Sequence, residues 1–359
     1  MRTLIGKLRT VLLMTTLAAA LVACGGDSAP ATGGTSGTEA ADASGTTPAS
    51  SAPAVEGSEA GGALTTLNVG DIKIAARTDG YAADKLGIFE RHGLEVNYTY
   101  ATSGQDIITA LESGQLDVGL AIPGTVMVAN ANQFDFVGLV QVETAHAEGP
   151  DTGGLVVRAD SDIQSLADLE GKSIAVNSTG ANQVYVSVLE ILRAAGIDAG
   201  TVQFQEIPFP QMGPVLTQGQ VDAIATVDPF TTMLTSSGEG RVVSWYYVEA
   251  LPEMPLGAFW AQRSWAEANP EVAEAFRAAM IEAGQHLSDN PDEARDLIAE
   301  FTGLDRAILD DMPLIQWDHE VSTDTWGRLA QMYVDAGLLD EPIAAEELLT
   351  EGAIAAGSG

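Results

Sequence analysis

Three short runs of small polar residues are the first candidates for binding chemistry in this sequence. They read Thr102-Ser103-Gly104, Pro123-Gly124-Thr125 and Asn177-Ser178-Thr179-Gly180, and each stands between a predicted strand and a predicted helix. The first N–H groups of a helix have no partner inside it, and the helix dipole adds positive charge there. Such a place binds an anionic or strongly polar group well. Each run alone is typical of a helix cap, so a shared site depends on how the fold places all three.

Charged and aromatic residues near these runs favour different kinds of ligand. Arg77 lies on a predicted strand-end loop, where its guanidinium could bind a carboxylate or sulfonate or form a surface salt bridge. Asp79 and Asp228 would repel an anion and would favour an amine or another hydrogen-bond donor. Four aromatic residues near loops could stack on a flat ligand or belong to the core: Tyr81, Phe209, Phe230 and Trp260. These residues leave the charge of the ligand open.

Motifs of common enzymes and metal sites are missing from the sequence. It contains no Gly-x-Ser-x-Gly elbow, phosphate-binding loop with Lys, His-Glu-x-x-His pair or cysteine cluster, and its four histidines are scattered. Asp117 and Asp222 could act as paired carboxylates, but each follows a predicted helix stop, where Asp commonly accepts backbone N–H groups. We therefore predict a binding protein that is not an enzyme, with no cofactor and no metal.

Two similar stretches organise the chain around these candidates. Residues 111–117 end in Gly114-Gln115-Leu116-Asp117, residues 216–222 end in Gly219-Gln220-Val221-Asp222, and each is followed by a short apolar strand and a proline. This pattern is typical of a helix end, a glycine with positive φ, a strand and the start of another helix. Two copies about a hundred residues apart predict two similar α/β lobes, with a ligand cleft at the carboxyl ends of their strands.

The order of predicted elements defines the expected fold. Strands and helices alternate with short loops, which predicts an α/β fold with mixed, largely parallel sheets. A polar break over residues 143–154 leads into the second lobe, the apolar run 256–261 returns to the first, and the chain beyond Pro270 is helical. We assign residues 64–151 and 256–359 to lobe I and residues 152–255 to lobe II, with two crossover segments between them.

The N-terminal segment carries an export and anchoring signal. Three basic residues precede an apolar run from Val11 to Val22 that is short for a membrane span, which is typical of a signal peptide over residues 1–23. Leu21-Val22-Ala23-Cys24 resembles the bacterial lipobox, which implies cleavage before Cys24 and attachment of lipid, including palmitate, to this only cysteine. Residues 25–63 are mostly Gly, Ser, Thr, Ala and Pro, so residues 24–63 are predicted to be a lipidated, flexible linker.

Net charge excludes one class of partner. The chain has a formal charge of −34, and loss of the signal peptide with its three cations leaves 13 basic residues against 50 acidic ones. Nucleic-acid binding depends on neutralising phosphates with Lys and Arg, so we expect no nucleic-acid partner. The acidic surface is instead expected to keep the protein in solution.

The chain also resembles a known family, the substrate-binding lipoproteins of ABC importers in the nitrate, taurine and alkanesulfonate group. The similarity covers most of residues 67–290, and the matching runs are 80–83, 86–96, 110–119, 167–176, 219–223, 228–230 and 269–271. It implies a two-lobed type II periplasmic-binding-protein fold that captures a small solute as the lobes close. It further implies delivery to an ABC permease and its ATPase, a monomer, and a location outside the cytoplasm, anchored to the outer face of the membrane.

The resemblance, together with the residues discussed above, gives a full set of predicted ligand-binding residues. They are Arg77, Asp79, Gly80, Tyr81, Ser103, Gly104, Pro123, Thr125, Asn177, Ser178, Thr179, Gly180, Asp228, Phe230 and Trp260. Sulfonate binders of the group usually show Gly-Thr/Ser-Ser-x-His/Tyr at the second-lobe helix start, where this chain has residues 177–182 as Asn-Ser-Thr-Gly-Ala-Asn.

Two alternatives to a sulfonate, taurine or nitrate solute therefore stay open. One is a heteroaromatic solute, such as a pyrimidine precursor of thiamine, riboflavin or an aromatic acid. The other is an enzyme on the same fold, similar to pyrimidine-forming proteins of the thiamine pathway, although the Cys-rich motif of those enzymes is absent here. A binding protein that presents its solute to a sensor kinase also stays open as a role.

Overall fold

The computed structural model describes residues 63–355 of the chain. The predicted signal peptide, Cys24 and all but the last residue of the linker lie outside the described residues. Between residues 63 and 355, no helix has both the length and the apolar character needed to cross a membrane.

The first of two five-stranded sheets has the strand order β2-β1-β3-β10-β4. Its strands are β1 (Thr65–Ile72), β2 (Leu94–Ala101), β3 (Val118–Ala121), β4 (Phe136–Thr144) and β10 (Pro255–Gln262). β1 pairs in parallel with β2 and β3, whereas β10 runs antiparallel to both β3 and β4. The predicted return of the chain at residues 256–261 is confirmed, because β10 lies inside this sheet.

The second sheet repeats the arrangement with the order β7-β6-β8-β5-β9. Its strands are β5 (Gly153–Arg158), β6 (Ser173–Val176), β7 (Gln203–Glu206), β8 (Ala223–Val227) and β9 (Gly240–Ser244). β6 is parallel to β7 and β8, and β5 is antiparallel to β8 and β9. Both sheets are mixed, as predicted, but parallel and antiparallel pairs are equally frequent. The expectation of largely parallel sheets was wrong, because β5 and β10 run antiparallel to their neighbours. These are the strands that the chain enters after each crossing.

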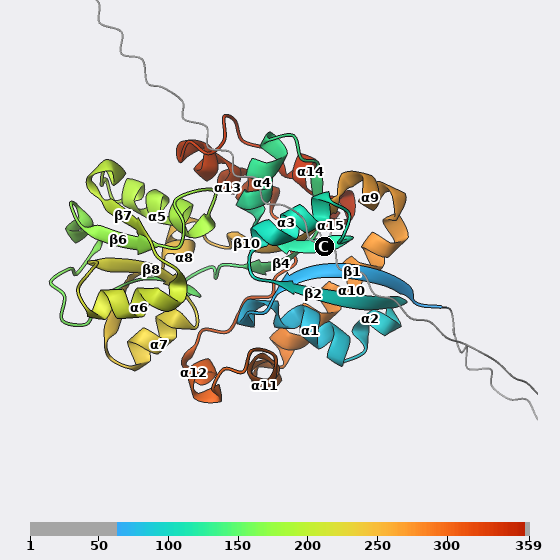
Figure 1. The fold of residues 1–359 in the computed structure, drawn as a ribbon, viewed down its shortest axis with the longest axis horizontal. Helices are drawn as coiled ribbons and strands as arrows, with labels where there is room; N and C mark the ends of the chain where they lie inside the picture. The colour runs from blue at the N-terminus through green and yellow to red at the C-terminus, as the bar shows by residue number, and fades with distance from the viewer. Residues whose placement is uncertain (1–62, 356–359) are drawn as a thin grey trace, which may run out of the picture. The chain divides into compact units, whose positions relative to one another are not determined.

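Helices cover both faces of the two sheets (Figure 1). The helices of the first sheet are α1 (Thr78–Lys85), α2 (Ile88–Arg91), α3 (Gly104–Glu112) and α4 (Pro123–Ala131). Those of the second are α5 (Gln183–Ala194), α6 (Phe209–Thr217) and α7 (Phe230–Ser236), with α8 (Tyr246–Ala250) before β10. Short 3-10 helices are η1 (Ala75–Arg77), η2 (Leu166–Leu169) and η3 (Ala199–Thr201).

The C-terminal part is mostly helical, as predicted, with irregular segments over residues 312–322 and 336–344. Its helices are α9 (Arg263–Ala268), α10 (Pro270–Asp289), α11 (Pro291–Thr302), α12 (Arg306–Asp311), α13 (Thr323–Asp335), α14 (Ala345–Leu348) and α15 (Glu351–Ala355). The first of these segments pairs with the first sheet, because the Thr144 amide donates to the Gln316 carbonyl at 3.1 Å. The C-terminal part is therefore attached to the first sheet at the end of β4.

The repeated stretches do what their pattern predicts. Gly114 and Gly219 have φ values of 70° and 68°, which only glycine adopts at little cost. The Asp117 carboxylate accepts the backbone N–H of Asn68 in β1 at 2.8 Å, and that of Asp222 accepts the N–H of Ser173 in β6 at 2.9 Å. Each Asp therefore ties a helix end to a strand of its own sheet, β1 or β6, and the structural interpretation of both residues is confirmed.

Two predicted boundaries were wrong. The polar run 143–154 is not a continuous break, because β4 extends to Thr144 and β5 begins at Gly153. The run 177–180 does not cap the following helix either. The N-cap of α5 is Asn182, whose side chain accepts the Val184 N–H at 3.0 Å. Thr179 is held elsewhere, because its N–H and hydroxyl both donate to Glu206 at the end of β7.

Close packing of the C-terminal helix α13 on α4 offers a test of the fold. A Cβ atom on Gly124 would lie 1.8 Å from the Tyr333 ring, whereas a Cβ on Gly327 of α13 meets nothing within 4 Å. We expect Gly124→Ala to lower the free energy of unfolding by about 1–3 kcal/mol through overpacking. Gly327→Ala should instead raise it by about 0.5–1 kcal/mol, because alanine favours helix. Urea unfolding measures both, and equal effects would contradict the packing described.

Candidate ligand-binding site

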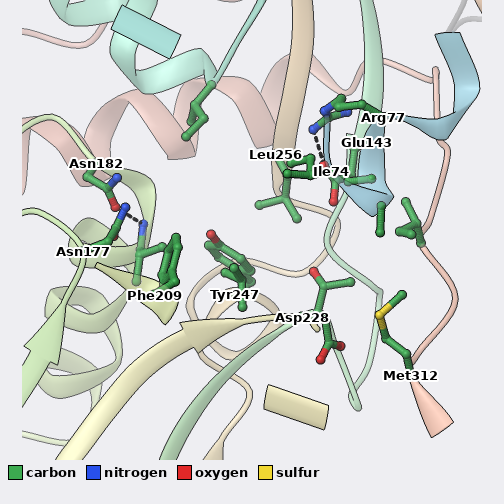
Figure 2. A pocket seen from close by; sticks show the side chains of 17 residues that line it. Ile74, Arg77, Glu143, Asn177, Asn182, Phe209, Asp228, Tyr247, Leu256 and Met312 are labelled. Atoms are coloured by element: carbon green, nitrogen blue, oxygen red, sulfur yellow. Dashed lines mark hydrogen bonds and ion pairs between the residues drawn. The ribbon is translucent and has the colours of Figure 1, made fainter. Parts of the chain in front are cut away.

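A pocket of about 190 Å³ lies where elements of the two sheets and the C-terminal segment meet (Figure 2). From the first sheet and its connections come Ile74, Ala75, Ala76, Arg77, Ile122, Glu143 and Leu256. From the second come Thr152, Asn177, Asn182, Val184, Phe209, Val227, Asp228 and Tyr247, and Met312 and Ile315 follow α12. The volume lies below the ~300–1,000 Å³ of pockets for drug-sized ligands, which favours a small solute.

The walls of the pocket are mostly apolar. Leu256, Met312 and Ile315 are buried, whereas Ile74 is 45% exposed. Phe209 and Tyr247 bring two aromatic rings to the pocket, and Phe209 is backed by Phe230 at a centroid distance of 6.3 Å with the rings 21° apart. Flat aromatic faces in a small apolar pocket favour a flat ligand.

The cation of the pocket is already paired. Arg77, on η1, is 4% exposed and its Nη2 forms a buried ion pair with Oε2 of Glu143, on β4 (Figure 2). Burial raises the pKa of Glu143 above its ordinary value, although the Arg77 charge opposes the shift. Nε and Nη1 of Arg77 have no hydrogen-bond partner among the described residues. The pair contributes donors to the pocket but almost no net positive charge.

Unpartnered acceptors face the same pocket from the second sheet. Oδ1 of Asp228 accepts the N–H and the hydroxyl of Thr232 at 2.9 and 2.8 Å, while its Oδ2 has no donor in the part of the chain that the structure describes. The same holds for Oδ1 of Asn177. Burial raises the pKa of Asp228 to about 6. Because buried polar atoms are nearly always hydrogen-bonded, these oxygens indicate a ligand that donates hydrogen bonds.

Three of the predicted site residues meet at this pocket, namely Arg77, Asn177 and Asp228. Pro123 and Thr125 lie close behind, since Pro123 directly follows the lining residue Ile122 and opens α4. The Thr125 hydroxyl donates to the Ala181 carbonyl at 3.3 Å, which links α4 to the loop before α5. Thr125 therefore joins the halves of the site, and neither Thr125 nor Pro123 lines the pocket.

Other predicted residues serve local structure outside the pocket. Asp79 and Gly80 are buried in α1, where burial raises the pKa of Asp79 to about 7. Ser103 caps α3 just before Gly104, accepting the Asp106 N–H at 3.3 Å. Ser178 and Gly180 belong to the loop that Thr179 ties to Glu206, and the Ser178 hydroxyl accepts the Gly180 N–H at 3.2 Å.

The aromatic candidates need correction. Trp260 is 0% exposed in the middle of β10, its indole N–H donates to the Ala121 carbonyl at 3.1 Å, and its ring packs against Trp326. Tyr81 stacks on Phe301 at 5.0 Å and donates its hydroxyl to Glu300. Both predictions as ligand walls were wrong, because partners within the chain occupy their faces and polar atoms. Phe230 supports Phe209 and does not line the pocket.

Several lining residues were not predicted as site residues. Glu143 is a charged residue at the end of an apolar strand, and that position could have identified it as a candidate site residue. Tyr247 belongs to an apolar and aromatic run whose pattern is equally typical of core residues and of pocket residues. Met312 and Ile315 carry no local signal, because only the tertiary path of residues 312–315 brings them to the pocket. Within residues 63–355 no group of three His, Cys, Asp or Glu side chains could hold a metal ion.

Two mixed sheets joined by crossings, with a pocket where they meet, define the periplasmic-binding-protein fold. A solved structure with this fold is the periplasmic aliphatic sulphonate binding protein SsuA from Escherichia coli. It matches with a TM-score of 0.67 and 20% identity, covering 77% of this chain and 94% of that chain. The family model described as NMT1/THI5 like matches residues 76–294. The chain belongs to this NMT1/THI5-like family.

Two relatives are named as binding proteins. The formylaminopyrimidine-binding protein of Halalkalibacterium halodurans is 25% identical over 250 residues, which is 69% of this chain and 72% of the relative. The taurine-binding periplasmic protein of Escherichia coli is 28% identical over 201 residues, or 56% of this chain and 60% of the relative. These relatives therefore recognise chemically different solutes.

The raised pKa of Asp228 predicts how stability depends on pH. Between about pH 4 and 6 the folded state binds more protons at this carboxyl than the unfolded state, so unfolding free energy falls as pH rises. Asp228→Asn keeps an oxygen acceptor for Thr232 and removes the buried charge. We expect its stability relative to the native chain to increase across this range, by up to about 3 kcal/mol at pH 7.

Urea unfolding at several pH values measures this difference. The matched control is Asp198→Asn, an exposed position whose side chain accepts the Gly200 N–H and where Asn also accepts. The free energy of unfolding of the control should differ from that of the native chain by the same amount at every pH. A difference that is also independent of pH for Asp228→Asn would contradict the burial of an unpaired carboxylate.

Proposed function

We propose that this protein is the extracytoplasmic solute receptor of an ABC importer, and that it binds a small flat heteroaromatic solute with N–H donors. The observation that carries the proposal is the pocket between the two sheets, with aromatic walls and unpartnered buried acceptors. Membership in the NMT1/THI5-like family and relatives named as binding proteins support a receptor over an enzyme.

Electrostatics favours the heteroaromatic alternative over a sulfonate, nitrate or taurine-type anion. An anion in the pocket would face Asp228 and Glu143, and the one lining cation, Arg77, is neutralised by Glu143. Desolvating an anion without a free cation is costly. An amino-substituted ring would instead donate to Asp228 and Asn177 and stack near Phe209 and Tyr247. The formylaminopyrimidine-binding relative supports this class, whereas the taurine-binding relative supports the alternative.

The arrangement of the sheets supports a mechanism of capture and delivery. We propose that residues 64–151 with 256–359 form lobe I, that residues 152–255 form lobe II, and that the lobes close on the solute as a monomer. The closed receptor then delivers the solute to a membrane permease driven by its ATPase. In this proposal residues 1–23 are removed, Cys24 is lipidated, and residues 24–63 tether the receptor to the outer face of the membrane.

A thermal-shift panel tests the solute class. At a hundred times its dissociation constant, a solute should stabilise the fold by about 2.7 kcal/mol. We expect 4-amino-2-methylpyrimidine and related aminopyrimidines to raise the melting temperature, and taurine, ethanesulfonate and nitrate to leave it unchanged. Asp228→Asn should weaken aminopyrimidine binding about 10- to 100-fold, because it removes a charged acceptor. The Asp198→Asn control should bind as the native chain does, and stronger binding of the sulfonates would overturn the assignment.

The proposed lipid anchor has its own test. In a bacterial host that lipidates exported proteins, the full chain should sediment with membranes and carry the mass of a lipidated N-terminal cysteine. Cys24→Ser should be recovered in the soluble fraction without that mass. Membrane association of the Cys24→Ser variant at the native level would contradict anchoring through this residue.

A further inference from the structure

Four pocket residues lie outside the part of the chain that matches the family model, and two of them follow it. The family match ends at residue 294, yet Met312 and Ile315 line the pocket and are 3% and 4% exposed. They lie in the irregular segment after α12, with Pro313 between them. The rest of the lining comes from residues 74–256, inside the matched region except for Ile74 and Ala75.

Contacts on the side of the first sheet fix the backbone of this segment. The Gln316 carbonyl accepts the Thr144 N–H at 3.1 Å, next to the lining residue Glu143. The indole N–H of Trp317 donates to the Ala76 carbonyl at 3.3 Å, and Nε2 of His146 lies 3.0 Å from the Leu314 carbonyl. The segment is therefore bound to the η1 turn, to β4 and to the first crossing.

Contacts on the other side join the same segment to α7 and α11. The hydroxyl of Ser236, at the end of α7, donates to Oδ2 of Asp311 at 2.8 Å, directly before Met312. Arg295 of α11 donates to the carbonyls of Leu309 and Met312 at 2.8 and 3.1 Å. Residues 311–317 are thus held from both sheets, and Pro313 further restricts the backbone.

We propose that Met312 and Ile315 determine the size of the solute that the pocket accepts, an inference that rests on the proposed function. Their backbone is held on both sides, so a longer solute cannot displace the segment without breaking these hydrogen bonds. The β-branched Ile315 is stiff and sets a fixed limit, whereas the flexible Met312 adapts to the solute edge. Selectivity for length therefore resides in two residues that follow the part of the chain matched by the family model.

A graded ligand series tests the proposal by isothermal titration. The probes are 4-aminopyrimidines with methyl, propyl or pentyl groups at position 2 or at position 5. We expect the native chain to bind the members with short alkyl groups and to lose affinity once the alkyl group exceeds a defined length. Met312→Ala and Ile315→Ala should bind the first excluded member about tenfold or more tightly, because one or two methylenes of space change affinity by such factors. Affinity for the shortest member should change much less.

Controls separate the possible failures. Met233→Ala removes a methionine that is 47% exposed on α7 and does not line the pocket, so its length limit should equal that of the native chain. Ile315→Val is the milder variant if Ile315→Ala does not fold, and it should shift the limit in the same direction. An unchanged limit in all pocket variants, with binding retained, would overturn the size-determining role alone. Absence of binding in native and variant chains would overturn the proposed solute class and this inference together.

Discussion

One buried ion pair lies where the chain leaves and re-enters the first sheet, and neighbouring strands pack around it. Arg77 follows β1, and its partner Glu143 is next to the last residue of β4, just before the first crossing. The guanidinium also lies against β10, since a Cβ on Gly257 would come within 2.3 Å of Nη2 of Arg77. Three strands and both crossings therefore converge on one charge. Removing either partner would leave an uncompensated charge in the interior, which is strongly destabilising.

The same interaction explains the character of the site. A pocket built around a satisfied ion pair has lost the positive charge that an isolated arginine would provide. Among the described residues, Oδ2 of Asp228 and Oδ1 of Asn177 then provide unpartnered acceptors, beside the unpartnered Nε and Nη1 of Arg77. The constraint that stabilises the crossings thus also biases the pocket toward neutral or cationic donors.

Local patterns in the sequence predicted much of the fold because the forces involved are local. A glycine with positive φ followed three residues later by Asp marks a helix end in both sheets, and Gly114 and Gly219 occur where this pattern requires them. The start of α5 was misplaced because Glu206, 27 residues away from Thr179, binds the loop that resembled a cap. The sequence predicted the alternation of strands and helices and the return of the chain at β10, whereas the direction of β5 and β10 depends on tertiary pairing.

The site was less predictable for the same reason. Asn177 and Asp228 follow strands directly, and Arg77 ends the short η1 turn after β1, so their chain positions place them at the pocket. Trp260 could be core or wall on sequence grounds, and only the contact with Trp326 decides it. Met312 and Ile315 reach the pocket through hydrogen bonds to residues more than 160 positions earlier, such as His146 and Thr144, for which a single sequence has no local signal.

The span of the pocket along the chain has a consequence for how the protein matures. Its lining runs from Ile74 to Ile315, so the pocket cannot form until both sheets and the segment after α12 are in place. Contacts between such distant residues close late in folding, because the entropy of long loops opposes them. A chain that stalls, or is cut before residue 312, can hold much of its secondary structure and still lack the pocket. A bound solute would thus distinguish finished receptors from incomplete ones.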